Sequence, residues 1–323
     1  MDFLLADFHD DLSSTVNAML TKADVPAVAR AWAAGDRSAA TSMYAQLADA
    51  GICGLLIDEA HGGSSAGAVE MVVAVEQLGR HCVPGPVAES IAVLPTLLRD
   101  ADVTGPLSAL AEGRLATCAI APLAPLAADA EGADIFVVTD GVLATAEVES
   151  TERSVDPTRT VSRVRPVRTL AENVDVDDAV DAGVLATAAQ LLGLGQAMLS
   201  IAADYAQARK QFGRPIGSFQ AVKHHLADVA IAIEMARPLV HVAALGIDGQ
   251  VPEDTDVRRD VSAAKVAAAE AANLSARRSL QVLGAIGYTA EHDLSLYLTK
   301  TRALLGAWGT PAAHRSRILE SLR

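Results

Sequence analysis

The stretch Tyr205-Ala-Gln-Ala-Arg-Lys-Gln-Phe-Gly-Arg-Pro-Ile-Gly-Ser-Phe-Gln220 joins two long Ala-rich segments and decides how the rest of the chain is interpreted. Cations stand in what would be the last turn of a helix, and Gly213 and Pro215 follow them. Because glycine and proline end helices, the pattern predicts a helix, a turn and a second helix that begins near Ser218.

Two residues of this stretch offer chemistry. The planar guanidinium of Arg209 can hydrogen-bond a phosphate, and Phe212 can present an apolar face to an aromatic base. Arg209 and Lys210 can equally complement the negative end of a helix dipole, and the spacing alone favours this second interpretation.

A second stretch, Gln281-Val-Leu-Gly-Ala-Ile-Gly-Tyr-Thr-Ala-Glu291, places Gln281 near a predicted helix end with small residues after it. Small residues let a ligand or another backbone approach closely. A plain helix C-cap at Gly284 or Gly287 explains the same residues, and physical reasoning leaves both interpretations open.

Outward from these stretches, the helical pattern is strongest towards the C-terminus. Long helices are predicted over 178–210, 217–247 and 255–283, and shorter ones near 292–305 and 311–322. They indicate a C-terminal helical bundle.

The first part of the chain also reads as mostly helical, up to about residue 112. Between about 115 and 174 the pattern changes to short β-favouring runs, and Asp140-Gly141 between two of these runs predicts a hairpin. The sequence therefore predicts a mostly α fold with a small central β-domain, divided into 1–114, 115–174 and 175–323.

Composition excludes several function classes. The chain has 323 residues, is 51% hydrophobic and only 3% aromatic, and carries 26 Lys+Arg against 40 Asp+Glu, a formal charge of −14. An acidic chain without a long basic stripe repels phosphates, so nucleic acid is not an expected partner. The apolar content excludes wholesale disorder.

Metal and targeting signals are missing. The three cysteines are widely spaced and form no Cys/His cluster, so the sequence predicts neither a disulfide framework nor a metal site, and the thiols are expected to be buried in a reducing cytoplasm. His224 and His225 point about 100° apart on a helix and cannot readily share an ion. The acidic N-terminus predicts no signal peptide, and the uncharged segment 184–203 is expected to be a buried helix rather than a membrane span.

Taken together, the sequence resembles the acyl-CoA dehydrogenase family over nearly its whole length. Arg209-Lys-Gln-Phe-Gly-Arg-Pro-Ile216 and Phe219-Gln-Ala-Val-Lys-His-His-Leu-Ala-Asp228 resemble the C-terminal signature of that family. Gln281-Val-Leu-Gly-Ala-Ile-Gly-Tyr-Thr289 resembles its second flavin-contact motif. Shorter stretches that fit its helical domain and β-domain are 47–51, 58–63, 76–79 and 156–159.

The resemblance implies an N-terminal helical domain, a β-domain, a C-terminal four-helix bundle, FAD as cofactor and an acyl-CoA as substrate. In the family, residues that match Arg209 and Phe212 contact the diphosphate and adenosine part of an FAD held mainly by a neighbouring subunit. Gln281 and Gly284 match positions that approach the same cofactor, and Gln220 matches a weaker contact. These five residues are the expected cofactor contacts.

The catalytic base of the family is missing. It is a glutamate, usually placed just before a Gly-Thr pair, but here Trp308 precedes Gly309-Thr310. In other relatives the base lies near the start of the first bundle helix, where counting back from Arg209 gives Gly183. Neither position has a carboxylate, and Asp181 is shorter and out of register.

The loop that cradles the flavin ring in the family, Thr-Glu-Pro-x-x-Gly-Ser-Asp, is also missing. Ile120-Ala-Pro-Leu-Ala-Pro125 stands in its place. The resemblance therefore implies a chain that has the contacts for the nucleotide end of FAD and lacks the base and the ring contacts.

We expect a base-deficient subunit of a heteromeric α2β2 acyl-CoA dehydrogenase in the cytoplasm. It would contribute FAD contacts to a catalytic partner that forms an α,β double bond in a fatty or steroid-derived acyl-CoA and passes electrons to an electron-transferring flavoprotein-type acceptor. One alternative is a homomeric dehydrogenase with a non-standard base, for which Asp181 is the candidate. Another is a non-redox scaffold of the same fold that binds no flavin.

Overall fold

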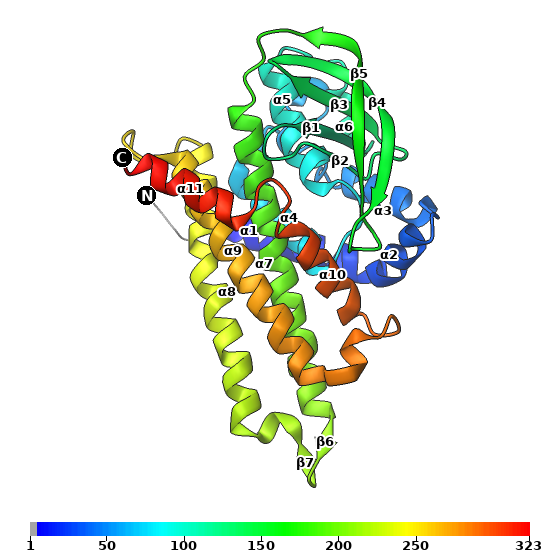
Figure 1. The fold of residues 1–323 in the computed structure, drawn as a ribbon, viewed down its shortest axis with the longest axis vertical. Coiled ribbons are helices and arrows are strands. Elements are labelled where there is room, and N and C mark those ends of the chain that lie inside the picture. Colours follow the sequence, from blue (N-terminus) through cyan, green and yellow to red (C-terminus); the bar gives the residue numbers. More distant parts are fainter. Residues whose placement is uncertain (1–4) are drawn as a thin grey trace.

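The computed structural model describes residues 5–323 and is organised around one buried helix, α7 (Asp177–Ala208) (Figure 1). Every residue of α7 from Asp181 to Gly195 is buried. A helix that is apolar on all sides is stable in water only when other elements cover it, and 78% of its most apolar window is buried here. The expected buried helix over 184–203 is therefore confirmed.

Four further helices follow α7 in the C-terminal part of the chain. The predicted segment 217–247 forms a 3-10 turn at Ile216–Ser218 and only then the helix itself, because Phe219 still has an extended backbone. The helices that follow α7 are α8 (Gln220–Ile247), α9 (Val257–Leu283), α10 (Leu294–Leu304) and α11 (Pro311–Ser321). The predicted mostly α fold with a C-terminal bundle is confirmed.

The N-terminal helices cover α7 from the other side. The helix α4 (Ala68–Arg80) is buried over nearly its whole length and packs against α7. A π-helical turn, η2 (Glu89–Val93), runs directly into α5 (Leu94–Asp100) beside it. The other N-terminal elements are α1 (Asp7–Lys22), α2 (Val25–Ala33), α3 (Ser38–Asp49), η1 (Glu59–His61) and α6 (Leu107–Ala111).

A five-stranded sheet lies at the upper end of the molecule in Figure 1. The expected hairpin is present: Thr139 pairs with Val142, and Asp140 and Gly141 have φ values of 51° and 75°. Both turn residues need positive φ, which explains the Asp-Gly pair. The strands, in spatial order, are β1 (Ala116–Ile120), β3 (Asp134–Thr139), β4 (Val142–Arg153), β5 (Thr160–Ala171) and β2 (Ala127–Ala128).

Two glycines let α4 and α7 cross with their backbones in contact. A Cβ on Gly193 would lie 1.9 Å from the carbonyl oxygen of Glu76, and a Cβ on Gly79 would lie 2.3 Å from that of Gln190. Neither helix can move away freely, because both are packed on their other sides. This reciprocal contact fixes the N-terminal helices on the bundle.

We predict that Gly193→Ala destabilises the protein by about 1–3 kcal/mol or more, because the added methyl group overlaps a rigid backbone. The matched control is Gly105→Ala, where a Cβ would meet no atom within 4 Å. It should change the free energy of unfolding by less than about 0.5 kcal/mol. Urea denaturation of both variants measures this, and equal stabilities would show that the crossing is not tight.

Candidate functional site

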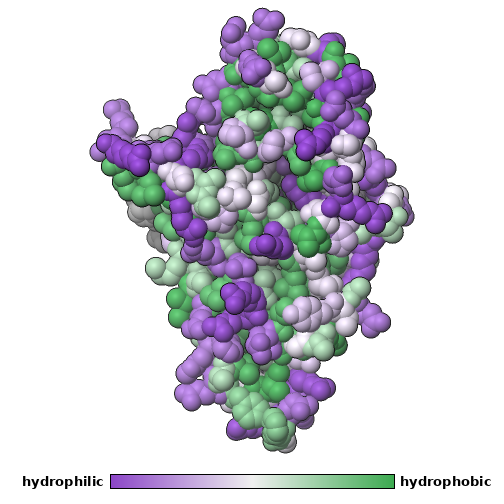
Figure 2. Space-filling model, viewed as in Figure 1, coloured by the Kyte–Doolittle hydropathy of each residue, from purple (hydrophilic) through white to green (hydrophobic). Residues whose placement is uncertain are grey.

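The stretch after α7 forms a small hairpin at the lower end of the bundle, with strands β6 (Lys210–Gln211) and β7 (Arg214–Pro215) (Figure 1). Phe212 and Gly213 make the two-residue turn, with φ values of 51° and 80°. The Phe212 side chain is 90% exposed and meets the ring of Phe219 edge to face at 6.1 Å. A two-residue turn therefore presents a large apolar side chain to solvent, and Figure 2 shows apolar surface at this tip between hydrophilic flanks.

Arg209 lies at the base of this hairpin as the C-cap of α7. It is exposed, and within residues 5–323 its guanidinium forms no ion pair. Lys210, Arg214 and Lys223 are exposed nearby and are likewise without ion pairs among the described residues. Although the chain is strongly acidic as a whole, this end is basic and suits an anion.

The other expected cofactor residues lie at helix ends. Gln220 is the first residue of α8, and Gln281 lies in the last turn of α9. Gly284 caps α9 with φ 66°, and a Cβ there would meet nothing within 4 Å. Its positive φ favours glycine, as in a plain helix C-cap, and the open space around it would let a ligand or another backbone approach. Both interpretations of this motif therefore fit the structure.

The two positions at which the family would carry its base touch each other. A Cβ on Gly183 would lie 2.7 Å from Cγ2 of Val93 and 2.8 Å from Cδ2 of Trp308. Trp308 is only 1% exposed, so its indole fills this space. No side chain fits at Gly183 while Trp308 is there.

Hydrogen bonds fix the Trp308 side chain and backbone. The indole Nε1–H donates to Oε1 of Glu89 at 3.1 Å, and the Trp308 carbonyl accepts from Nε2 of His314 at 2.9 Å. The guanidinium of Arg159 lies 4.0 Å from the same Glu89 oxygen. Glu89 is buried in this cluster, and the sequence analysis did not identify it. The available sign was that Glu89 is a single charged residue within an apolar run.

A small cavity of about 190 Å³ adjoins this cluster. Trp308, Glu89 and Arg159 line one part of it, and Leu123 to Leu126 line another. The stretch Ile120–Pro125 thus contributes to the lining of this cavity, and its side chains are aliphatic or proline and offer no hydroxyl or carboxylate.

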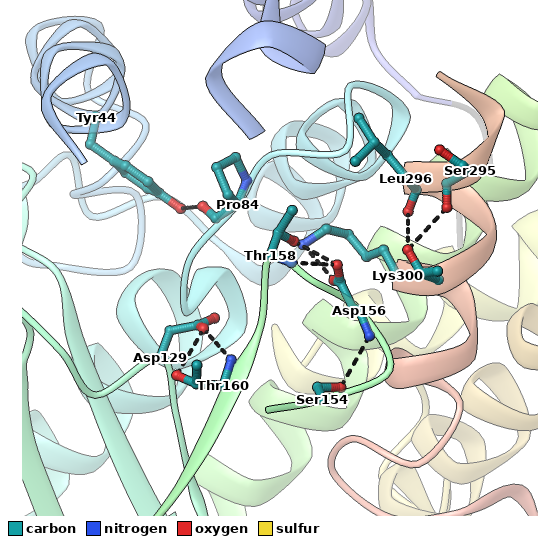
Figure 3. Close-up of polar contacts among 11 residues, drawn as sticks. Tyr44, Pro84, Asp129, Ser154, Asp156, Thr158, Thr160, Ser295, Leu296 and Lys300 are labelled. Atoms are coloured by element: carbon teal, nitrogen blue, oxygen red, sulfur yellow. Dashed lines mark hydrogen bonds and ion pairs between the residues drawn. The ribbon is translucent and has the colours of Figure 1, made fainter. Parts of the chain in front are cut away.

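The stretch 156–159 is the loop that anchors the long hairpin of β4 and β5 (Figure 3). Asp156 is fully buried, accepts hydrogen bonds from Thr158 at 2.8 and 2.9 Å, and lies 3.5 Å from Nζ of Lys300 on α10.

Nearby, Asp129 accepts a hydrogen bond from the Thr160 N–H at 2.8 Å. Burial raises the pKa of Asp129 to about 6, although the charge of Arg159 opposes this. The loop thereby holds Arg159 beside Glu89.

Asp181 does not face the Trp308 cluster. It accepts a hydrogen bond from Arg317 at 2.8 Å, lies 3.7 Å from Nε of Arg258 and lines a different cavity, of about 410 Å³, near the start of α7. Burial raises the pKa of this carboxyl, and both arginines counteract that effect. Its position removes the geometric basis for proposing it as the base of this site.

The environment of Trp308 also predicts a pH dependence of stability. Burial lowers the pKa of His314 to about 4, although its hydrogen bond to the Trp308 carbonyl opposes this. The ordinary value, and that of the unfolded chain, is about 6.5. The unfolded chain therefore binds the proton first, and stability is complete above about pH 6.5 and falls as the pH is lowered towards 4.

Between pH 6.5 and 4 the free energy of unfolding should fall less in His314→Gln than in the unchanged protein. We predict that the difference is at most about 3 kcal/mol. His81 and His241, whose pKa values burial also lowers to about 4, continue to contribute. Urea denaturation of both proteins at several pH values measures the difference. The same slope in both would show that His314 is not held neutral by the fold.

Two family models and a curated relative match this chain. The model of the acyl-CoA dehydrogenase N-terminal domain matches residues 7–101, and that of the C-terminal domain matches residues 177–323. "Acyl-CoA dehydrogenase IpdE2" of Mycobacterium tuberculosis is 32% identical over 295 residues, which cover 90% of this chain and 89% of that protein.

Two further proteins are similar to this chain. "Acyl-CoA dehydrogenase FadE34" of M. tuberculosis is 32% identical over 301 residues, which cover 85% of this chain but only 41% of that protein. A solved structure of the Tcur3481-Tcur3483 steroid ACAD has the same fold, with a TM-score of 0.85, 22% identity and 98% of each chain covered.

Proposed function

The chain belongs to the acyl-CoA dehydrogenase family, and we propose that it is the base-deficient subunit of a heteromeric enzyme, completing the FAD site of a catalytic partner. One observation carries the proposal: Trp308 packs against Gly183, so that an indole occupies the space at both family positions for the base. The reaction needs a group that removes the α-proton of the acyl thioester.

Trp308 is not such a group, because an indole N–H donates hydrogen bonds and cannot accept a proton. Its N–H already donates to Glu89. A positioned general base contributes roughly 10²–10⁴-fold to the rate, and the partner subunit would supply it.

The lower end of the bundle fits the nucleotide part of FAD. The Arg209 guanidinium is exposed and free of ion pairs within the described chain, as a residue that binds a diphosphate with its planar fork would be. Phe212 offers its exposed ring to the adenine. Gln220, Gln281 and Gly284 are exposed and would approach the same cofactor, as the resemblance implies.

The upper end of the chain does not fit the flavin ring. Ile120–Pro125 provides no side-chain donor, and the adjoining cavity of about 190 Å³ is narrow. When bound in the partner's site, FAD supplies the acceptor for the β-hydrogen as hydride. The residues of this chain would bind and orient its nucleotide end.

The relatives support a two-chain enzyme. The match to FadE34 covers 41% of that protein, which leaves room for a second unit of similar size in one polypeptide. The structural relative is a pair of proteins described as a steroid ACAD. We therefore infer an α2β2 assembly that acts on a steroid-derived or fatty acyl-CoA and passes electrons to an electron-transferring flavoprotein-type acceptor.

We predict that the isolated chain has no dehydrogenase activity towards any acyl-CoA, since it carries no base at either position. To test this, the chain is purified by itself and after co-expression with a dehydrogenase encoded by a neighbouring gene. Flavin absorbance, oligomer size and turnover are then compared between the two preparations. The proposal expects flavin and turnover only in the complex.

Two other results would contradict the proposal. Flavin and turnover in the isolated chain would indicate a homomeric enzyme with a base elsewhere. A chain without flavin in either preparation would indicate a scaffold of the same fold.

We also predict that Arg209→Ala weakens the binding of flavin in the complex while the subunit stays folded. A charge-assisted hydrogen bond is worth about 1.5–3 kcal/mol, more than a charge at a helix end, so the loss should be about 10–100-fold in affinity. Flavin released on dilution or dialysis of the complex measures it.

Two variants control for charge and exposure. Arg209→Lys keeps the charge without the planar fork and should be intermediate. Arg163→Ala removes an exposed arginine on β5 and should leave flavin content unchanged. If Arg209→Ala also leaves it unchanged, Arg209 only complements the dipole of α7.

A further inference from the structure

The nearly buried arginine Arg159 has more hydrogen-bond donors than the chain satisfies. Its side chain is only 12% exposed, and within residues 5–323 its guanidinium forms no hydrogen bond. The nearest carboxylate oxygen, Oε1 of Glu89, lies 4.0 Å from Nη2, which is beyond hydrogen-bond distance. An arginine has five N–H donors, and a buried donor without an acceptor costs free energy. The guanidinium is therefore suited to an acceptor that comes from outside the chain.

The cavity of about 190 Å³ beside Trp308 gives such an acceptor a place. Arg159 and Glu89 both line it, and most of the remaining wall is apolar, with Leu123, Leu126 and the indole of Trp308 among its residues. A cavity of about 150 Å³ holds a benzene molecule, so this one is large enough for a ligand of about six to ten non-hydrogen atoms. The cavity therefore combines one cation with a small apolar space.

The surrounding structure holds both charged residues in the wall. Glu89 begins the π-helical turn η2, and such turns occur frequently at functional sites. It is only 4% exposed, and its Oε1 accepts a hydrogen bond from the indole of Trp308. Arg159 follows the loop in which the buried Asp156 accepts hydrogen bonds from Thr158 (Figure 3). The fold thus places a cation and a carboxylate together at one small cavity.

The charges favour a ligand with a single negative charge. A guanidinium can donate two parallel hydrogen bonds to a carboxylate or to a phosphate. Glu89 lies close to the Arg159 guanidinium, and Asp129 interacts with the same charge. These carboxyl groups repel a second negative charge, which disfavours a dianionic phosphate. The apolar wall suits a short hydrocarbon part.

We propose that this cavity binds a small carboxylate with a short apolar part, such as isobutyrate or benzoate, through paired hydrogen bonds from Arg159. The lining residues come from the segment between β1 and β2, from the hairpin of β4 and β5, and from α10 and the turn after it. The ligand would therefore connect these three parts of the chain. This inference goes beyond the partner role and does not depend on it, because it concerns only residues of this chain.

Trp308 serves as a reporter of binding. The chain has two tryptophans, so in the full-length variant Trp32→Phe the indole emission comes from Trp308 alone. We expect isobutyrate and benzoate to change this emission in a saturable way and to raise the melting temperature. The neutral amides of the same shape, isobutyramide and benzamide, should bind about 10-fold more weakly, because they lack the charge-assisted contact. Inorganic phosphate should also bind more weakly.

Two further variants in the same background test the two charged residues. Arg159→Met keeps the length of the side chain and should lower the affinity for the carboxylates about 10–100-fold, whereas Arg163→Met, an exposed position on β5, is the matched control and should not. Glu89→Gln keeps an acceptor for the indole N–H and removes the like charge, so it should strengthen binding of the carboxylates. This variant decides the matter if Arg159→Met does not fold.

Three results would overturn the proposal. One is the absence of a saturable change in Trp308 emission with either carboxylate. The second is equal affinity for the carboxylates and their amides. The third is an unchanged affinity in folded Arg159→Met, or unchanged or weaker binding in Glu89→Gln.

Discussion

The close packing around α7 is the constraint on which the rest of the structure depends. From Asp181 to Gly195 the helix is buried on all sides, and three of its glycines set how closely its neighbours approach. Gly193 faces the backbone of α4, Gly183 faces the indole of Trp308, and a Cβ on Gly195 would lie 3.4 Å from Cα of Ala272 on α9. Glycine in a helix costs about 1 kcal/mol relative to alanine, so three in one buried helix indicate that close approach offsets this cost.

The same constraint shapes the chemistry of the chain. Because Gly183 leaves room for an indole, Trp308 can fill the space between α7 and η2, where Glu89 and His314 hold it by hydrogen bonds. A glutamate could not be added at Gly183 without displacing Trp308. The two positions at which the family carries its base are thus part of a packed and hydrogen-bonded core. This is what we expect of the base-deficient subunit proposed above.

Much of this fold could be predicted from the sequence because the signals are local. Asp140-Gly141 predicts its hairpin through the positive φ of both residues, and the Ala-rich segments predict α7, α8 and α9 through helical periodicity. The Trp308–Glu89 hydrogen bond joins residues 219 positions apart, and no local pattern predicts such a contact. The sequence also left open whether Arg209 complements the dipole of α7 or binds a cofactor. Its exposure, and the absence of an ion pair within residues 5–323, can be seen only in the structure.

In the proposed enzyme, each flavin needs surface from two unlike chains. In the proposed enzyme this chain would provide Arg209 and Phe212 for the nucleotide end of FAD. It lacks side-chain donors for the ring in Ile120–Pro125, so it would complete a partner's site but not its own. Flavin quantitation of the purified complex, against the measured amount of each chain, tests this most directly. We expect one FAD for each pair of unlike chains, two in an α2β2 tetramer. One FAD on every chain, four in a tetramer, would contradict the proposed sharing of the site.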